Sequence, residues 1–348
     1  EKETTKAGAY TLKTSSKHTI EYPYPVAISV HAASIGMEYP MICFNFGRPN
    51  EDGTYSDATK WRMISVIIHE VGHFFIPMII NSDERQWTWM DEGLNTFVQS
   101  LTQKEYYKDM PLRRGTAESI VDYMRSPKDM LRPIMTNSEQ IASREFGANA
   151  YGKPASALSV LRETIMGPKL FDYAFKEYSR RWAFKHPDPA DFFRTMEDAS
   201  AIDLDWFWRG WFYSTDNVDV SVEGVKWFKM KNVDKPFENK AKVENKEIKG
   251  KKNQSDDPKY AMPFEPSEFY FSSTNKNEYR EFMNQVDDEK IKMQNSNKNF
   301  YEVTFENKGG LVTPLIIEWT YEDGSIEIEK LPAEIWRLNE TVVSKVFV

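Results

Sequence analysis

Residues 63–80 read MISVIIHEVGHFFIPMII, and this stretch decides the fold. Its apolar residues recur at the i, i+3, i+4, i+7 spacing of a half-buried helix. The apolar positions are Ile64, Ile67, Ile68, Val71, Phe74, Phe75 and Met78. We expect Asp57 or Thr59 to cap this helix and Pro77 to end it, because proline has no backbone N–H to donate.

His69 and His73 lie four residues apart in this helix, and Glu70 lies between them. Positions i and i+4 share one helix face, so two imidazoles can converge on one tetrahedral zinc ion. Glu70 lies off that line, where a carboxylate is poorly placed to bind the metal but well placed to hold a water molecule there. Ser65 and Gly72 flank the same polar stripe, which we expect to face a cleft rather than the core.

A catalytic zinc site needs three protein ligands and an open position for water. Glu92 follows His73 after 18 residues, in the segment WMDEGLN at 89–95. This distance is sufficient to leave one helix, turn and enter an adjacent antiparallel helix. A carboxylate that favours a helix dipole is the alternative for Glu92, but Asp91 would fill that role equally well. We therefore predict one zinc ion, bound by His69, His73 and Glu92.

These motifs resemble the gluzincin aminopeptidases of the aminopeptidase N family of zinc metallopeptidases. The match begins with H-E-x-x-H, 18 residues, and then Glu inside W-x-x-E-G. Upstream, Ile35–Tyr39 (IGMEY) resembles the family's G-A-M-E-N segment. Downstream, Tyr151–Lys153 (YGK) resembles its Y-x-K. Ile35, Gly36 and Tyr39 depart from the family segment, and Pro154 replaces the usual Gly after Y-x-K.

The resemblance implies a zinc-dependent aminopeptidase that hydrolyses the amino-terminal bond of peptides. It implies that Glu70 is the general base and that His69, His73 and Glu92 bind the metal. It implies further that Glu38 binds the substrate's free amino terminus and that Tyr151 stabilises the tetrahedral intermediate. From the residues alone, an exposed strand carboxylate and an ordinary buried tyrosine remain alternatives for these last two.

Two other functions stay open. A thermolysin-like endopeptidase also uses H-E-x-x-H with a downstream Glu. That fold spaces the Glu one residue further, and it leaves Glu38 and Tyr151 unexplained. A catalytically silent peptide-binding scaffold would keep the fold, although the intact set of site residues argues against it.

The sequence predicts an α+β protein. We expect a mainly helical, thermolysin-like zincin catalytic domain with a small β-sheet over residues 1–215, without the family's amino-terminal β-domain. An antiparallel β accessory domain is expected over residues 216–348, with a charged loop or linker at about 236–258. The runs Val26–His31 and Met41–Phe46 predict two paired strands.

Further elements follow from apolar periodicity. The predicted helices are Asp91–Tyr107, Thr116–Met124, Gly152–Met166, Lys169–Trp182, Asp188–Ala199 and Leu204–Tyr213. Residues 1–20 read as one helix or as a ragged start. The predicted strands are Val218–Val222, Val225–Met230 and short runs within 299–348. The aromatic residues that crowd 206–213 are expected in the core or in an interdomain contact.

The composition limits the function classes. With 40% hydrophobic and 14% aromatic residues, the 348-residue chain can bury a core. A net charge of −8 disfavours nucleic-acid binding, and a single cysteine excludes an intrachain disulfide. Charged and polar groups interrupt residues 63–80, so a membrane-spanning helix is not expected. Periplasmic, secreted and cytoplasmic locations stay open; the polar start without Met favours a processed, exported product. The oligomeric state stays open.

Overall fold

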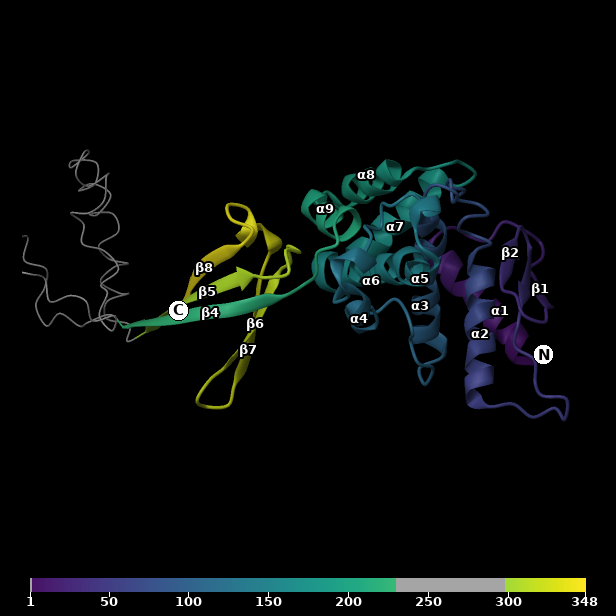
Figure 1. Ribbon diagram of the computed structural model, residues 1–348, viewed down its shortest axis with the longest axis horizontal. Helices are drawn as coiled ribbons and strands as arrows, with labels where there is room; N and C mark the ends of the chain where they lie inside the picture. Colours follow the sequence, from purple (N-terminus) through teal and green to yellow (C-terminus); the bar gives the residue numbers. More distant parts are fainter. Residues whose placement is uncertain (1, 230–297) are drawn as a thin grey trace, which may run out of the picture. The chain divides into compact units, whose positions relative to one another are not determined.

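The computed structural model describes residues 2–229 and 298–348, which form two compact units. The first unit comprises residues up to Val218 together with Gly309–Ala333, and the second comprises the remainder. The α+β class is confirmed, because helices dominate the first unit and antiparallel strands follow (Figure 1). The predicted domain boundary at residue 215 stays a prediction. The charged loop predicted at about 236–258 lies outside the described residues.

The first unit is built mainly of helices, three of which (η1, η5 and η6) are π-helical turns. Its helices are α1 (Lys2–His18), α2 (Asp57–Gly72), η1 (Trp89–Gly93), α3 (Leu94–Tyr106), η2 (Glu118–Ile120), α4 (Val121–Met124), η3 (Lys128–Met130), η4 (Ser138–Gln140), α5 (Ser143–Phe146), η5 (Gly147–Gly152), α6 (Lys153–Val160), η6 (Leu161–Met166), α7 (Pro168–Trp182), α8 (Pro189–Ser200) and α9 (Asp205–Tyr213). The predicted helices are confirmed, although Thr116–Met124 is reduced to the short pieces η2 and α4. Residues 2–18 form one helix rather than a ragged start.

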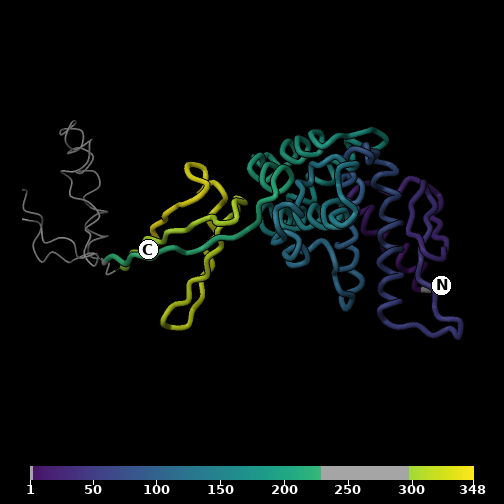
Figure 2. The backbone as a smooth tube through the Cα atoms, viewed as in Figure 1, coloured from purple at the N-terminus to yellow at the C-terminus, as the bar shows by residue number. Residues whose placement is uncertain are grey.

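A three-stranded sheet lies beside α2 (Figures 1 and 2). Its strands are β1 (Ile28–His31), β2 (Met37–Tyr39) and β3 (Ile42–Asn45). The predicted pairing of two strands is confirmed, since β3 pairs in parallel with β1. Strand β2 lies between the two predicted runs and carries Glu38; it pairs antiparallel with β3 and places Glu38 opposite Cys43. Opposed residues share a sheet face, so Glu38 lies on the same buried side as the fully buried Cys43.

Helix α2 begins at Asp57, one residue before the earliest start that the predicted caps would give. Ser56 is the cap, and its Oγ accepts a hydrogen bond from the Thr59 amide at 3.1 Å. The expectation of Asp57 or Thr59 as cap is therefore wrong. The predicted end at Pro77 is also wrong, because the helix ends at Gly72. Tighter i+3 hydrogen bonds follow, including that from Phe75 N to Gly72 O at 3.0 Å.

An aromatic core fixes the turn between α2 and α3. Four aromatic residues of α9 are buried, which confirms the core interpretation of that run: Phe207, Trp208, Trp211 and Phe212. Trp89, the first residue of η1, stacks on Phe193 with centroids 5.9 Å apart and meets Phe212 edge-on at 4.9 Å. Because Trp89 precedes Asp91 and Glu92, this packing anchors the acidic turn.

The remaining strands are antiparallel. Strands β6 (Leu315–Thr320) and β7 (Ile326–Leu331) form a hairpin that belongs to the first unit. The second unit is a sheet of β4 (Val220–Lys229), β5 (Asn299–Asn307) and β8 (Val342–Phe347), in the order β4-β5-β8. The two strands predicted at 218–230 are one strand with a bulge between Val222 and Gly224. A short 3₁₀ turn, η8, covers Ala333–Trp336.

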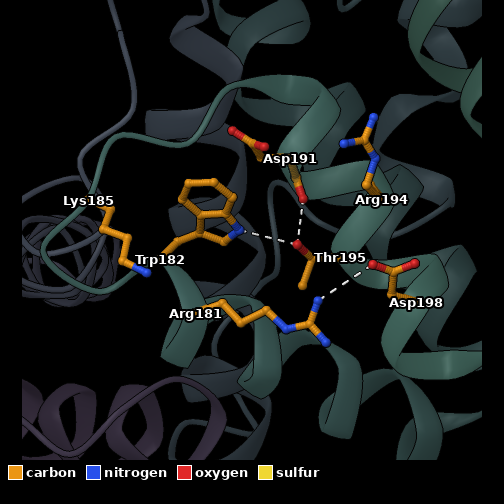
Figure 3. A pocket seen from close by; sticks show the side chains of 7 residues that line it. All are labelled: Arg181, Trp182, Lys185, Asp191, Arg194, Thr195 and Asp198. Atoms are coloured by element: carbon orange, nitrogen blue, oxygen red, sulfur yellow. Dashed lines mark hydrogen bonds and ion pairs between the residues drawn. The ribbon is translucent and has the colours of Figure 1, made fainter.

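A surface cavity of about 320 Å³ lies between α7 and α8 (Figure 3). Its lining residues are Arg181, Trp182, Lys185, Asp191, Arg194, Thr195 and Asp198, none of which is a predicted site residue. Arg181 is already paired with Asp198 at 3.6 Å, and Trp182 donates to Thr195 Oγ1 at 3.2 Å.

Within the described residues, no helix is both long and apolar enough to cross a membrane.

An ion pair links η6 to α7. Arg162 donates to both carboxylate oxygens of Asp172, at 2.7 and 2.8 Å, and His18 Nδ1 lies 3.6 Å from the same carboxylate. Burial raises the pKa of Asp172, but hydrogen bonds from Arg162 and His18 outweigh burial and hold that pKa well below its usual range. A carboxyl group whose pKa is lowered on folding stabilises the fold above its unfolded-state pKa.

Asp172→Asn should therefore lower the free energy of unfolding by about 2 kcal/mol near neutral pH. The difference from wild type should shrink as the pH falls from about 4 toward the lower folded-state pKa. Urea unfolding at about pH 7 and about pH 2 measures both effects. Asp198→Asn, at the exposed pair with Arg181, is the control and should cost less than about 1 kcal/mol. Equal losses in the two variants would contradict the assignment.

Candidate metal centre and active site

Three predicted ligands converge between α2 and η1. His69 Nε2 lies 2.9 Å from Glu92 Oε2 and 3.1 Å from His73 Nε2, and His73 Nε2 lies 3.3 Å from the same Glu92 oxygen. Tetrahedral ligands that are each about 2.0–2.1 Å from zinc lie about 3.3 Å from one another. The triangle of donor atoms therefore has the size that zinc requires, and two His and one Glu are a known catalytic donor set.

The other nitrogen of each imidazole is held by a neighbour. His69 Nδ1 lies 3.1 Å from Gln99 Oε1, and His73 Nδ1 lies 2.8 Å from Ile76 O and 2.9 Å from Asp91 Oδ1. A ring nitrogen that donates to such an oxygen leaves the opposite nitrogen free to bind a metal. Both rings are thereby fixed with Nε2 toward Glu92.

Close packing of α2 on α3 sets the position of these ligands. A Cβ on Gly72 would lie 2.2 Å from Asn95 Oδ1, and Asn95 Nδ2 donates to the His69 carbonyl at 2.9 Å. Gln99 Nε2 donates to both Ser65 O and Ser65 Oγ at 3.0 Å. The expectation that the stripe at Ser65 and Gly72 faces a cleft is therefore wrong, because this stripe faces α3.

Two π-helical turns carry Glu92 and Tyr151. Turn η1 holds Glu92 and turn η5 holds Tyr151, whose hydroxyl donates to Glu92 Oε1 at 2.6 Å. The turns approach closely because Gly93 has no side chain: a Cβ there would lie 2.9 Å from Ala150 O of η5 and 2.5 Å from Pro154 Cγ at the start of α6. Pro154, which departs from the resembled motif, therefore packs against a glycine. The Tyr151 ring also stacks near the His69 ring, with centroids 5.7 Å apart.

Glu70 is buried beside the predicted metal ligands, with 6% of its surface exposed. Gly36 makes room for it, since a Cβ on Gly36 would lie 2.4 Å from Glu70 Oε1. Burial raises the pKa of Glu70 to about 8; His73 opposes this shift, and Glu38 adds to it together with other carboxylates. A general base works best when its pKa is close to the working pH, so this environment suits proton transfer.

Glu38 joins the same cluster from strand β2. One of its carboxylate oxygens lies within 4.8 Å of ligand atoms of both His73 and Asp91. Glu38 and Asp91 also line a cavity of about 360 Å³. The other lining residues are Glu84, Arg85, Thr88, Ser138, Glu139 and Phe146. A carboxylate at the wall of a cavity is suited to bind a cationic group.

The site is rich in acidic groups. Burial lowers the pKa of His69. Burial would also lower the pKa of His73, but Asp91 and Glu92 outweigh it and hold that pKa well above the usual value. Burial raises the pKa of Asp91 to about 7, and it would raise that of Glu92, but hydrogen bonds from the two histidines hold the Glu92 pKa well below its usual range. Carboxylates that favour a proton on an imidazole also favour a metal cation beside it.

The structure brings together all six predicted site residues. Sequence reasoning missed the supporting residues Asn95 and Gln99, although Glu92, Asn95 and Gln99 have the i, i+3, i+7 spacing of one helix face. Asp91 was considered only as a partner of a helix dipole, and its contact with His73 was not predicted. Arg114 is exposed, and its guanidinium group lies over the Tyr151 ring.

Comparisons with known proteins support the family resemblance that the sequence motifs indicate. The family model described as Peptidase family M1 domain matches residues 7–211. Glutamyl aminopeptidase of Sus scrofa is 23% identical over 184 residues, which cover 51% of this chain and 19% of that protein. Probable aminopeptidase 2 of Sulfurisphaera tokodaii is 24% identical over 218 residues, which cover 60% of this chain and 28% of that protein.

Among solved structures, Legionella pneumophila aminopeptidase A in complex with aspartic acid has the same fold. The TM-score is 0.55 at 12% sequence identity, and the match covers 99% of this chain and 32% of that one. The chain spans less than a third of the length of each of these three proteins. The family match covers more than half of the chain, and the chain therefore belongs to peptidase family M1, as its motifs predict.

Proposed function

We propose that this chain carries the catalytic site of a zinc-dependent aminopeptidase, which hydrolyses the amino-terminal bond of peptides. The observation that carries this proposal is the triangle of His69, His73 and Glu92 donor atoms, with edges of 2.9 to 3.3 Å, beside the buried Glu70. The names of the relatives, which are aminopeptidases, support it.

His69, His73 and Glu92 would hold the zinc ion. When bound, zinc polarises the scissile carbonyl and lowers the pKa of water toward about 7. Glu70 takes a proton from the attacking water and passes it to the leaving amine. Its burial keeps the carboxylate basic enough to accept that proton near neutral pH.

Tyr151 and Glu38 act on the substrate on either side of the reacting carbon. The Tyr151 hydroxyl donates a hydrogen bond to the oxyanion, and Glu92, its partner at 2.6 Å, keeps it close to the metal ligands. Glu38 pairs with the α-ammonium group of the peptide, and this anchor leaves room for one residue between the amine and the metal. A carboxylate oxygen of Glu38 lies within 4.8 Å of a ring nitrogen of His73, which places Glu38 beside the proposed metal ligands.

We expect the purified protein to bind about one zinc equivalent, because three ligand atoms converge on one point. His73→Ala should reduce the bound zinc strongly, since it removes one of three ligands. Elemental analysis after dialysis measures the content. His31→Ala, a histidine on strand β1 outside the cluster, is the control and should keep full zinc. A wild-type protein that is active without metal would refute the site.

Glu70→Gln should keep the zinc and lose turnover by about 10²- to 10⁴-fold, because the amide cannot accept the water proton. The substitution is nearly isosteric, so the fold and the ligands should persist. Turnover of aminoacyl-naphthylamides, measured with metal content of the same sample, tests this expectation. Glu105→Gln, at an exposed pair with Lys17, is the matched control. Full activity of Glu70→Gln at saturating substrate would exclude Glu70 as the base.

Acetylation of the amino terminus should lower kcat/KM by about 10²- to 10³-fold, because Glu38 would lose its cationic partner while desolvated. One peptide is compared in its free and N-acetylated forms. Glu38→Gln should shrink the difference, whereas Glu51→Gln, in an exposed turn, should leave it unchanged. Equal cleavage of both peptides, or cuts within a longer peptide, would favour the thermolysin-like endopeptidase. No turnover in a zinc-loaded protein would favour a silent scaffold.

A further inference from the structure

A cation lies on the ring of the proposed oxyanion donor. The Arg114 guanidinium carbon is 4.4 Å from the centroid of the Tyr151 ring, which is within the range of a cation–π interaction. None of the described carboxylates forms an ion pair with Arg114. The ring is therefore its main electrostatic partner in this part of the chain.

The backbone that carries Arg114 is held against the helix that follows Tyr151. Ser159 Oγ donates to the Gly115 carbonyl at 2.6 Å, and Ser156 Oγ donates to the Thr116 carbonyl at 2.7 Å. Both serines belong to α6 and are buried. Gly115 has φ +80, a conformation that favours glycine, and a Cβ there would lie 2.9 Å from Ser100 Cβ. The backbone of residues 114–116 is therefore held in one conformation.

The π-helical turn that carries Tyr151 also makes room for the guanidinium. A Cβ on Gly147, the first residue of η5, would lie 3.3 Å from Arg114 Nη2. Arg114 thus contacts η5 at Gly147 and at Tyr151, four residues apart. Helix α6 follows η5 directly, so the loop, the turn and the helix fix the cation and the ring relative to each other.

We propose that Arg114 is a positioning residue for the reaction, which holds the Tyr151 ring by a cation–π contact and strengthens its hydroxyl as a donor to the oxyanion. This inference rests on the proposed function. The Tyr151 hydroxyl donates to the Glu92 carboxylate, and Asp91 adds a second acidic group nearby. Those negative charges oppose any negative charge on the phenol oxygen, and a cation over the ring offsets them. Arg114 therefore strengthens this hydrogen bond only when the oxyanion forms in the transition state.

The test compares kcat and KM of Arg114→Met, Arg114→Lys and Arg113→Met on an aminoacyl-naphthylamide. Arg114→Met should lower kcat by about ten-fold with little change in KM, because the contact acts in the transition state. Arg114→Lys keeps the charge but not the planar face, so it should recover part of the loss. Arg113→Met removes a neighbouring exposed arginine and should behave as wild type.

A double variant separates action through Tyr151 from a general effect of charge. In a Tyr151→Phe background, Arg114→Met should change kcat by less than about two-fold, since the hydroxyl is already absent. A ten-fold loss there, an equal loss in Arg113→Met, or a rise in KM alone would overturn the proposal. Wild-type turnover of the substrate reports separately on the proposed function.

A readout without turnover uses the unfolding midpoint in urea. Arg114→Met, Tyr151→Leu and the double variant should give non-additive shifts, because one contact is lost in all three. Additive shifts would show that the two side chains do not interact and would overturn the proposal, whether or not the chain is active. Arg113→Met combined with Tyr151→Leu is the control pair, and its shifts of the unfolding midpoint should be additive.

Discussion

The close approach of α2 and α3 at Gly72 and Asn95 is the constraint on which the site depends. The Asn95 amide occupies the space that any side chain at residue 72 would need, and it binds the His69 carbonyl. Glu92 lies about one turn before Asn95, so the distance between the helices decides how near its carboxylate comes to the imidazoles. A longer separation would leave two ligands on one helix without the third.

Much of the fold and of the site could be predicted from the sequence. His69 and His73 lie in one helix, and Glu92 follows after a single turn, so short-range sequence patterns were sufficient to identify these three residues. Apolar periodicity likewise located the main helices. The predictions failed where a tertiary contact decides the secondary structure. Strand β2 has three residues and no pattern of its own, and its partner β3 creates it. Helix α2 ends at Gly72 through tighter hydrogen bonds that the apolar run does not reveal.

The burial of acids is the main energetic cost of the site. Glu38, Glu70 and Asp91 are each less than a tenth exposed, and Glu92 is only slightly more accessible. Removing several carboxylates from water is unfavourable unless a cation compensates them. The histidines compensate in part. A bound dication would complete the balance, so metal binding and the stability of this region are expected to be linked.

The π-helical turns have a consequence for how the chain tolerates changes in length. A π turn holds one more residue than an α-helical turn of the same register. Deleting a single residue from η1 or η5 would return the turn to α-helical geometry and leave the residues that follow in register. The side chains within the turn, which include Glu92 in η1 and Tyr151 in η5, would then point in new directions, although composition and apolar content would hardly change. A change of length in these turns would therefore disturb the site even where Glu92 and Tyr151 are themselves kept.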